Sequence, residues 1–226
     1  MIETVIFVFL VSSVSILGSL YVRKYQKPDA LVGIYVGSVL VSNILAYKIA
    51  SYDLGVFTLF APASVIIFSV TYLLTDIVNE RFGREATLQM IWVAFLTQLV
   101  AVVFILIAIA LPSAPFWTDQ EAFSRILSSA PRVIAASLFT FIIMETLDAY
   151  VFHWFKQKTQ GRHLWLRNVA STIPAMTLDT ILFVFLAFYG VFPILQLIIG
   201  VIVIKWLVGV IDIPFMYLNR WIMNKT

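Results

Sequence analysis

The sequence has 226 residues, of which 62% are hydrophobic and only 12% are charged, and its mean hydropathy is +0.99. Soluble domains have about 45–50% apolar and about 25% charged residues, so a soluble core is excluded and most of the chain is expected in lipid. The formal net charge of +3 does not indicate nucleic-acid binding, because the basic residues lie in short breaks between apolar runs. Cysteine is absent and only two histidines occur, so we expect neither a metal site nor another cofactor.

Seven apolar runs follow one another, each near the about 20 residues that a helix needs to cross a bilayer. They comprise residues 4–22, 31–52, 56–75, 86–111, 132–154, 172–190 and 194–218. The third run contains Pro62 and passes into a polar stretch, which indicates a kinked or re-entrant helix. The sequence therefore predicts an all-α polytopic membrane protein with about seven transmembrane helices, in which residues 1–226 form a single transmembrane domain.

The breaks between the runs differ in their content of lysine and arginine. Alternate breaks and the C-terminal tail hold eleven of these residues, whereas the opposite breaks hold only Arg125 and Arg132. The positive-inside rule then predicts a plasma-membrane protein with its N-terminus outside and its C-terminus in the cytoplasm. Six spans would leave the C-terminus inside and move the N-terminus there too. For the long outer loop at 112–131 we weigh a short interfacial helix or lid against a solvated connector.

Small residues recur every four positions along the second run, at Ser38, Ser42, Ala46 and Ala50, and are preceded by Gly33 and Gly37. This spacing lets helix backbones approach closely. The stripe is explained by packing within the bundle or, alternatively, by docking of another subunit, which leaves a homodimer open.

The polar stretch at 71–84 combines residues of one helical face. These residues stand at i, i+3, i+4 and i+7, and they are Asp76, Asn79, Glu80 and Gly83. We expect this face near the cytoplasmic end of the third run, as a gate or as a polar anchor of the helix. Arg81 or Arg84 is the expected partner of its acids.

Polar side chains also lie within the apolar runs, although a charge at the centre of a spanning helix costs roughly 2.5–3.5 kcal/mol. These side chains belong to Lys48, Glu145, Asp148, Asp179, Lys205 and Asp212, with neutral Asn43 and Gln98. They must face the bundle interior, either as ion pairs that hold helices together or as the lining of a polar cavity. We favour the cavity because the acids outnumber the bases.

Two pairings of these charges are available from their positions in the sequence. Glu145 and Asp148 are one helical turn apart, and two carboxylates that close cannot both ionise cheaply, so at least one needs a cationic partner or a proton. Lys48 is available to either of them. Lys205 in the last run is available to Asp179 in the sixth.

Enzymatic chemistry finds little support in the sequence. There is no G-x-S-x-G elbow, H-E-x-x-H pair, Walker loop or G-x-G-x-x-G turn. An intramembrane aspartyl hydrolase needs two facing aspartates, which Asp148 and Asp179 are able to supply, but no surrounding motif accompanies them. We therefore do not expect an enzyme.

Several stretches together resemble the queuosine precursor transporter family, also called the vitamin uptake transporter (VUT) family. The clearest is T-D-I-V-N-E-R-F-G-R at 75–84, which is similar to the family signature D-x-x-N-E-x-[YF]-G. The others are S-N-I-L-A-Y-K at 42–48, P-R-V-I-A-A-S-L at 131–138, L-W-L-R-N-V-A-S-T at 164–172 with L-D-T-I-L-F at 178–183, and K-W-L-V-G-V-I-D-I-P at 205–214. The resemblance covers about residues 42–214.

The resemblance implies a fold similar to the S-components of energy-coupling-factor transporters. Residues 29–226 would form the six-helix core, and residues 1–28 would add an N-terminal helix. It also implies uptake of 7-deazaguanine bases, preQ0 or preQ1. A carboxylate accepts hydrogen bonds from N1–H and the exocyclic amine of such a base at once.

The substrate-binding residues expected on these grounds are Asn43, Lys48, Gln98, Glu145, Asp148, Asn168, Asp179, Lys205 and Trp206, and the gate or polar cluster is Asp76, Asn79, Glu80 and Arg84. Besides Trp206, other aromatic rings for stacking on a base are Tyr47, Phe139 and Phe183. Two alternative functions are a binding subunit that needs an energising partner, and a vitamin or purine transporter or receptor.

Overall fold

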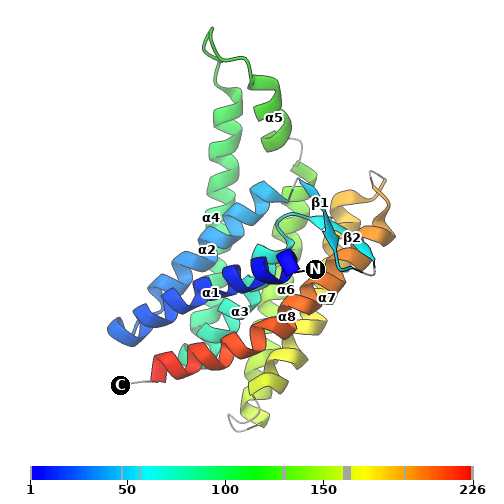
Figure 1. Cartoon of the computed structure of the whole chain (residues 1–226). Coiled ribbons are helices and arrows are strands. Elements are labelled where there is room, and N and C mark those ends of the chain that lie inside the picture. The colour runs from blue at the N-terminus through cyan, green and yellow to red at the C-terminus, as the bar shows by residue number, and fades with distance from the viewer. Residues whose placement is uncertain are drawn as a thin grey trace.

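The computed structural model describes residues 2–46, 48–55, 57–128, 131–159, 164–190 and 192–224, and within these ranges it contains eight helices and one two-stranded sheet. The helices are α1 (Ile2–Tyr25), α2 (Asp29–Leu45), α3 (Val65–Phe82), α4 (Arg84–Ala110), α5 (Gln120–Ser128), α6 (Pro131–Lys158), α7 (Leu164–Phe188) and α8 (Ile194–Asn224) (Figure 1). Strands β1 (Ile49–Asp53) and β2 (Thr58–Pro62) connect α2 to α3.

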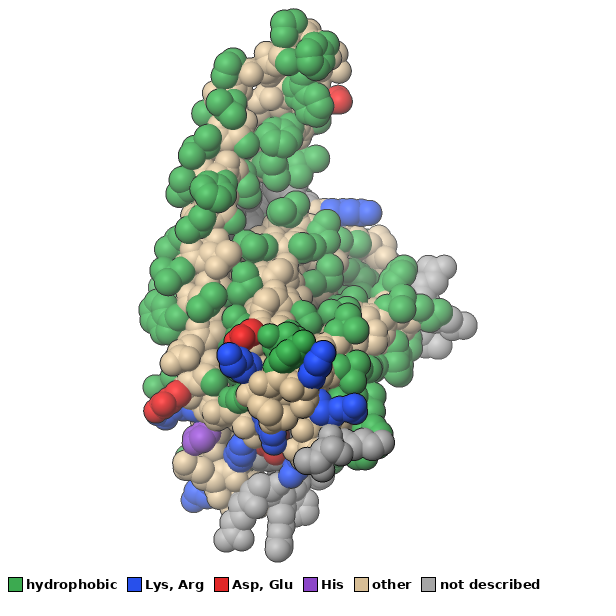
Figure 2. Space-filling view, turned by 90° about the vertical axis from the view of Figure 1, so that its left-hand side faces the viewer, with side chains coloured by type: hydrophobic (Ala, Val, Ile, Leu, Met, Phe, Trp, Pro, Cys, Tyr) green, Lys and Arg blue, Asp and Glu red, His purple; other side chains and the backbone are tan. Residues whose placement is uncertain are grey.

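The lengths and exteriors of the helices agree with a polytopic membrane protein. Among the residues that the structure describes, four segments are long and apolar enough to cross a bilayer, namely Val5–Tyr25, Arg84–Ala110, Ala135–Lys158 and Ile194–Asn224. Two shorter apolar segments there are Asp29–Leu45 and Ile173–Phe188. Figure 2 shows one face of the molecule, where hydrophobic side chains cover most of the surface and charged side chains gather toward one end. The number of seven spans stays a prediction.

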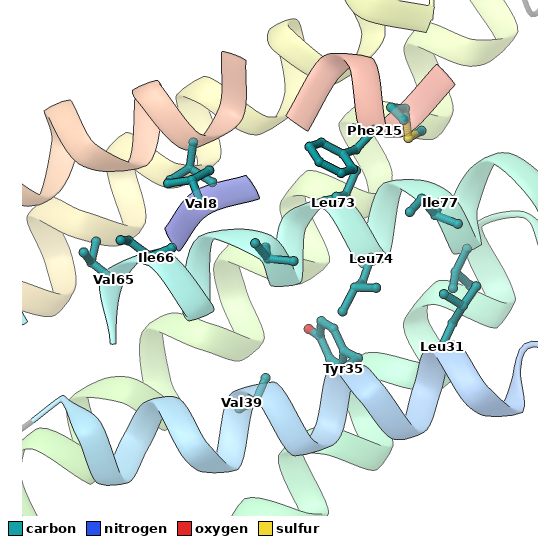
Figure 3. Close-up of a cluster of buried hydrophobic side chains, with 14 of the residues drawn as sticks. Val8, Leu31, Tyr35, Val39, Val65, Ile66, Leu73, Leu74, Ile77 and Phe215 are labelled. Carbon is teal, nitrogen blue, oxygen red and sulfur yellow. The ribbon is translucent and has the colours of Figure 1, made fainter. Parts of the chain in front are cut away.

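Helix α3 lies at the centre of the bundle. Thirteen of its 18 residues are buried, and it contacts α1, α2, α4, α6 and α8. Figure 3 shows Leu74 beside Tyr35 of α2 and Leu73 beside Phe215 of α8. A helix that is enclosed on all sides has no continuous polar face for water, which explains why α3 is apolar except near its C-terminal end.

The described residues are mostly helical, as predicted, but the second run is not helical throughout and the third run begins with a strand rather than a helix. Helix α2 ends at Leu45, and residues 49–62 form an antiparallel hairpin in which Ile49 pairs with Pro62 and Asp53 with Thr58. Gly55 turns the chain with φ +85°, and its N–H donates to Asp53 Oδ1 at 2.7 Å. Hydropathy windows missed the hairpin because apolar strands and apolar helices score alike.

The hairpin packs closely against α8. A Cβ placed on Gly200 would lie 2.1 Å from the carbonyl oxygen of Phe60, so only glycine lets the backbone of β2 approach α8 this far. Within the hairpin, Tyr52 donates a hydrogen bond to the Pro62 carbonyl at 3.2 Å, and burial raises the pKa of Tyr52 to about 12. The hairpin is therefore positioned on α8 by the close approach of the Phe60 backbone to Gly200.

Helix α1 is joined to α8 by buried polar side chains. Ser12 Oγ donates to Asp212 Oδ1 at 2.6 Å, and Ser19 Oγ donates to Asn219 Oδ1 at 2.7 Å. Asn219 Nδ2 in turn donates to Ser15 Oγ at 2.8 Å. Such hydrogen bonds between helices satisfy groups that hydrocarbon cannot solvate, so the first helix is fastened to the last one rather than loosely appended.

Two further predictions concern the outer loop and the small-residue stripe. Residues 120–128 of the loop form α5, which is the helical alternative, and Gln120 Nε2 donates to the Ile109 carbonyl of α4 at 3.2 Å. In Figure 1, α4 and α5 project beyond the other helices. Only part of the small-residue stripe on the second run is packed within the bundle. Ser42 is buried, whereas a Cβ placed on Gly33 or Gly37 would meet no other atom within 4 Å. The homodimer stays a prediction.

Candidate functional site

A cavity of about 50 Å³ lies where the hairpin meets the bundle. Its wall is formed by α2, Pro62 at the end of β2, α3, α6, α7 and α8. Asn43, Asp179 and Lys205, all expected from the sequence to bind a substrate, line it together. Segments far apart in the chain thus converge on one polar space inside an apolar bundle.

An ion pair forms one wall of this cavity. Lys205 Nζ of α8 lies 2.5 Å from Asp179 Oδ2 of α7, and both side chains are about 95% buried. The predicted pairing of these two residues is confirmed. Lys205 Nζ also lies 5.2 Å from the centroid of the Phe68 ring, which adds a cation–π contact. A paired charge is the form in which ions are tolerated at this depth.

A hydrogen-bonded chain of neutral side chains connects three helices at the same cavity. Asn43 Nδ2 of α2 donates to Gln98 Oε1 of α4 at 2.6 Å, and Ser137 Oγ of α6 donates to Asn43 Oδ1 at 3.0 Å. Gln98 is buried behind Asn43 and does not line the cavity. Its role is to hold the Asn43 amide in place, while Asn43 itself faces the space.

The aromatic surfaces of the cavity come from Phe68 of α3 and Phe183 of α7. Phe183 was among the expected rings, but Phe68 was not, because nothing in the sequence separates it from the apolar residues around it. Trp206 lies outside the cavity: its side chain is 42% exposed and its Nε1 donates to Thr177 Oγ1 at 3.0 Å. Phe139 is also exposed on the outer surface.

Of the remaining expected site residues that the structure describes, Lys48 and Asp148 do not line this cavity. Lys48 is exposed in the turn between α2 and β1, so the prediction that it lies inside a spanning helix is wrong. Its pairing with Glu145 or Asp148 stays a prediction. Asp148 is buried on α6, one residue from Ala149, whose carbonyl accepts a hydrogen bond from Asn79 of α3 at 2.9 Å. The side chains of Glu145 and Asn168, and residue Tyr47, lie outside the described part of the chain.

The polar face of α3 forms a second cluster, near the C-terminal end of that helix. Asp76 and Asn79 are both buried, so this face points into the protein. Glu80 lies 3.6 Å from Lys156 of α6 and 3.6 Å from Arg220 of α8. Lys156 Nζ also donates to the Glu80 carbonyl at 2.6 Å, which places a cation at the negative end of the α3 dipole.

The expected partners of this face are corrected by the structure. Arg81 donates to Gln26 Oε1 at 2.7 Å and to Asn224 Oδ1 at 3.3 Å, and Arg84 stacks on the Tyr150 ring at 4.3 Å. Neither arginine forms an ion pair with Asp76 or Glu80. Arg81 contacts Gln26 and Asn224 instead, and Arg84 belongs to α4, beyond the break in the helix at Gly83, where φ is +86°. The cluster instead links α3 to α6 and α8 through Lys156 and Arg220. These partners are distant in the sequence, so the sequence alone did not predict them.

A helical bundle with an apolar exterior and several helices long and apolar enough to cross a bilayer is the architecture of a polytopic membrane protein. The chain belongs to the family described as "Putative vitamin uptake transporter", whose profile matches residues 62–219. It is also 32% identical over 166 residues to the "Probable queuosine precursor transporter" of Bacillus subtilis (strain 168), covering 71% of this chain and 72% of that protein. No solved structure matches the chain.

Proposed function

We propose that this chain imports a queuosine precursor, a 7-deazaguanine base such as preQ0 or preQ1, across the cell membrane. The family and the Bacillus subtilis relative support the substrate class. The observation that carries the proposal is the ion pair of Asp179 and Lys205 on the wall of the central cavity. No enzymatic step is included in this proposal.

The chemistry of the ion pair fits the edge of a guanine-type base. That edge presents a carbonyl acceptor, the N1–H donor and an exocyclic amine donor in a row. Asp179 is able to accept from both donors, and Lys205 is able to donate to the carbonyl oxygen. Adenine has an amine donor in place of the carbonyl and an N1 acceptor in place of N1–H, so we expect the same ion pair to discriminate against adenine. Asn43 and the hydroxyl of Ser137 are available to other polar atoms of the ring system.

The rings of Phe68 and Phe183 supply the apolar surfaces that a flat heterocycle needs. Stacking of a base on an aromatic ring is worth about 1–3 kcal/mol in nucleic-acid complexes. The cavity of about 50 Å³ is much smaller than typical ligand pockets of about 300–1,000 Å³. We infer that this is a closed state and that the elements around the cavity separate when a base enters.

Uptake of labelled preQ0 by a bacterial strain that cannot synthesise it tests the proposal. Cells that express this chain are expected to accumulate label, whereas cells with an empty vector are not. Asp179→Asn together with Lys205→Met is expected to abolish the gain without preventing insertion in the membrane, because neither buried ion is left without its partner. Equal accumulation with the chain and with the empty vector contradicts the proposal.

A vitamin as substrate is the second candidate, and the description of the matching family favours it. A thermal-shift panel of purines and vitamins on the purified protein separates the two. Stabilisation by preQ0 or preQ1 alone supports the deazapurine, whereas stabilisation by a vitamin alone replaces it. A binding subunit with an energising partner is the third reading, and autonomous flux into liposomes excludes it.

We also infer that the N-terminus is outside and the C-terminus is cytoplasmic. Basic side chains from three separate parts of the chain support this, because they meet at one end of the bundle. Arg81 contacts Gln26 after α1, and Lys156 and Arg220 both lie 3.6 Å from Glu80. An end of a transmembrane bundle that is rich in lysine and arginine is typically the cytoplasmic end. Accessibility of single cysteines at positions 27 and 113 to an impermeant reagent tests the orientation.

A further inference from the structure

We propose that the cavity between the start of α4 and the end of α6 binds the headgroup of an anionic phospholipid. This cavity has a volume of about 460 Å³ and is separate from the central one. It is lined by Arg84 at the beginning of α4 and by Tyr150, His153, Trp154 and Gln157 on the last turns of α6. The proposed transport function leaves this cavity unused.

The cationic group of the site is held in a fixed orientation. The guanidinium of Arg84 stacks on the Tyr150 ring with 4.3 Å between Cζ and the ring centroid. Stacking leaves the N–H groups at the edge of the guanidinium available for a bidentate contact with phosphate oxygens. Gln157 Nε2 lies 3.1 Å from His153 Nε2, so an amide and an imidazole supply further polar groups beside the arginine.

The surroundings of the cavity favour an anion. Lys158 Nζ lies 5.3 Å from the centroid of the Trp154 ring, next to the cavity wall, and adds a second positive charge. Glu85 is the acidic residue at the rim, and it is exposed to solvent, where its charge is screened. Basic pockets between transmembrane helices at the cytoplasmic side of a membrane are typical sites for anionic headgroups.

The surface next to the cavity indicates a lipid rather than a free phosphate ion. Ile143, Leu147, Tyr150 and Trp154 are each 41–52% exposed and stand at i, i+4, i+7 and i+11, so they form one apolar strip along α6. The strip begins at the cavity and runs away from the charged end of the molecule. A phospholipid is able to place its phosphate at Arg84 and its acyl chains along this strip, whereas a free anion gains nothing from it.

Native mass spectrometry of the purified full chain tests the site with phosphatidylglycerol, phosphatidylethanolamine and inorganic phosphate as probes. We expect tighter binding of phosphatidylglycerol than of phosphatidylethanolamine. In Arg84→Gln, phosphatidylglycerol affinity is expected to fall about tenfold, as for the loss of one charge-assisted contact. Lys24→Gln is the matched control, because Lys24 also stacks on a ring, that of Tyr25, at 5.0 Å. Its affinity for the lipid is expected to be unchanged.

A second variant keeps the test decisive if Arg84→Gln does not fold. Gln157 is exposed, so Gln157→Glu is expected to fold normally and to expel the headgroup by adding a negative charge to the cavity. Wild-type affinity for phosphatidylglycerol in Gln157→Glu overturns the proposal. Displacement of the lipid by millimolar inorganic phosphate also overturns it, because the site would then belong to the free ion. Equal losses of phosphatidylglycerol affinity in Arg84→Gln and Lys24→Gln would show that only the net positive charge matters, and this result also overturns the proposal.

Discussion

Lys205 Nζ of α8 lies 2.5 Å from Asp179 Oδ2 of α7, and this contact joins two helices at the wall of the central cavity. Two buried ions in apolar surroundings stabilise a protein only as a pair, since either one alone keeps its full desolvation cost. The same pair presents a donor and an acceptor side by side to the cavity. Stability and substrate recognition therefore depend on the same two side chains.

Lys205→Met is expected to lower the melting temperature strongly, because it leaves the Asp179 carboxylate buried without a cation, at a cost of about 3–5 kcal/mol. Asp179→Asn together with Lys205→Met removes both charges and is expected to recover most of that stability. Uptake of preQ0 is expected to stay lost in both variants. Thermal unfolding in detergent and the uptake assay measure the two effects. A single Lys205→Met variant with wild-type stability contradicts the importance of the pair, and Lys27→Met, at an exposed lysine, is the control.

Asn43→Ala is expected to lower both stability and uptake. The variant leaves Gln98 Oε1 and Ser137 Oγ without the partners they have at 2.6 Å and 3.0 Å, and an unsatisfied buried polar group costs about 1–3 kcal/mol. Thr97→Val is the control, because Thr97 Oγ1 donates only to the Val93 carbonyl of its own helix, at 2.7 Å. Uptake at the wild-type level in Asn43→Ala would remove Asn43 from the site.

Gly200→Ala is expected to displace the hairpin from α8. The added Cβ would lie 2.1 Å from the Phe60 carbonyl oxygen, which belongs to the backbone and cannot rotate away. Overpacking of this kind costs about 1–3 kcal/mol. Gly209→Ala is the matched control on the same helix, since the nearest atom to its Cβ is Met176 Sδ at 4.0 Å. Equal melting temperatures for the two variants would show that the hairpin does not depend on this contact.

Ser12→Ala is expected to destabilise the protein by about 1–3 kcal/mol, because Asp212 Oδ1 loses the hydroxyl that donates to it at 2.6 Å inside the α1–α8 interface. Ser13→Ala changes the neighbouring serine, whose hydroxyl donates to the Leu10 carbonyl within α1 at 2.6 Å. That variant is expected to unfold at the wild-type temperature. Matching melting curves for the two variants would mean that α1 is not held by this contact.

Asp76→Asn tests the polar face of α3 as a gate. The substitution keeps the size of a buried side chain and removes its charge, so we expect a folded protein with a melting temperature near that of the wild type and with little uptake. Asp29→Asn changes an exposed acid at the start of α2 and is the control for the loss of one negative charge. Normal uptake by Asp76→Asn excludes the gate and leaves an anchoring role for this face.

The sequence alone determined the class of the protein and the position of most helices. Hydropathy and run length are local properties, and a run of about 20 apolar residues has few alternatives to a spanning helix. The predicted runs at 86–111 and 194–218 accordingly overlap α4 and α8 over nearly their whole length. The spacing of Asp76 and Asn79 likewise placed both on one helical face, because helical periodicity fixes which side chains share a direction. That this face is buried is visible only in the structure.

Only the tertiary structure decided which polar groups meet. Each helix is free to rotate about its axis until it packs, so the sequence could not show that Trp206 faces outward while Lys205, its neighbour, faces the cavity. It also could not show that residues 49–62 leave the helical pattern, since strand pairing depends on a partner segment and on the close approach to Gly200. The composition determines that this protein lies in lipid, and packing between distant segments of the chain determines which residues form its candidate site.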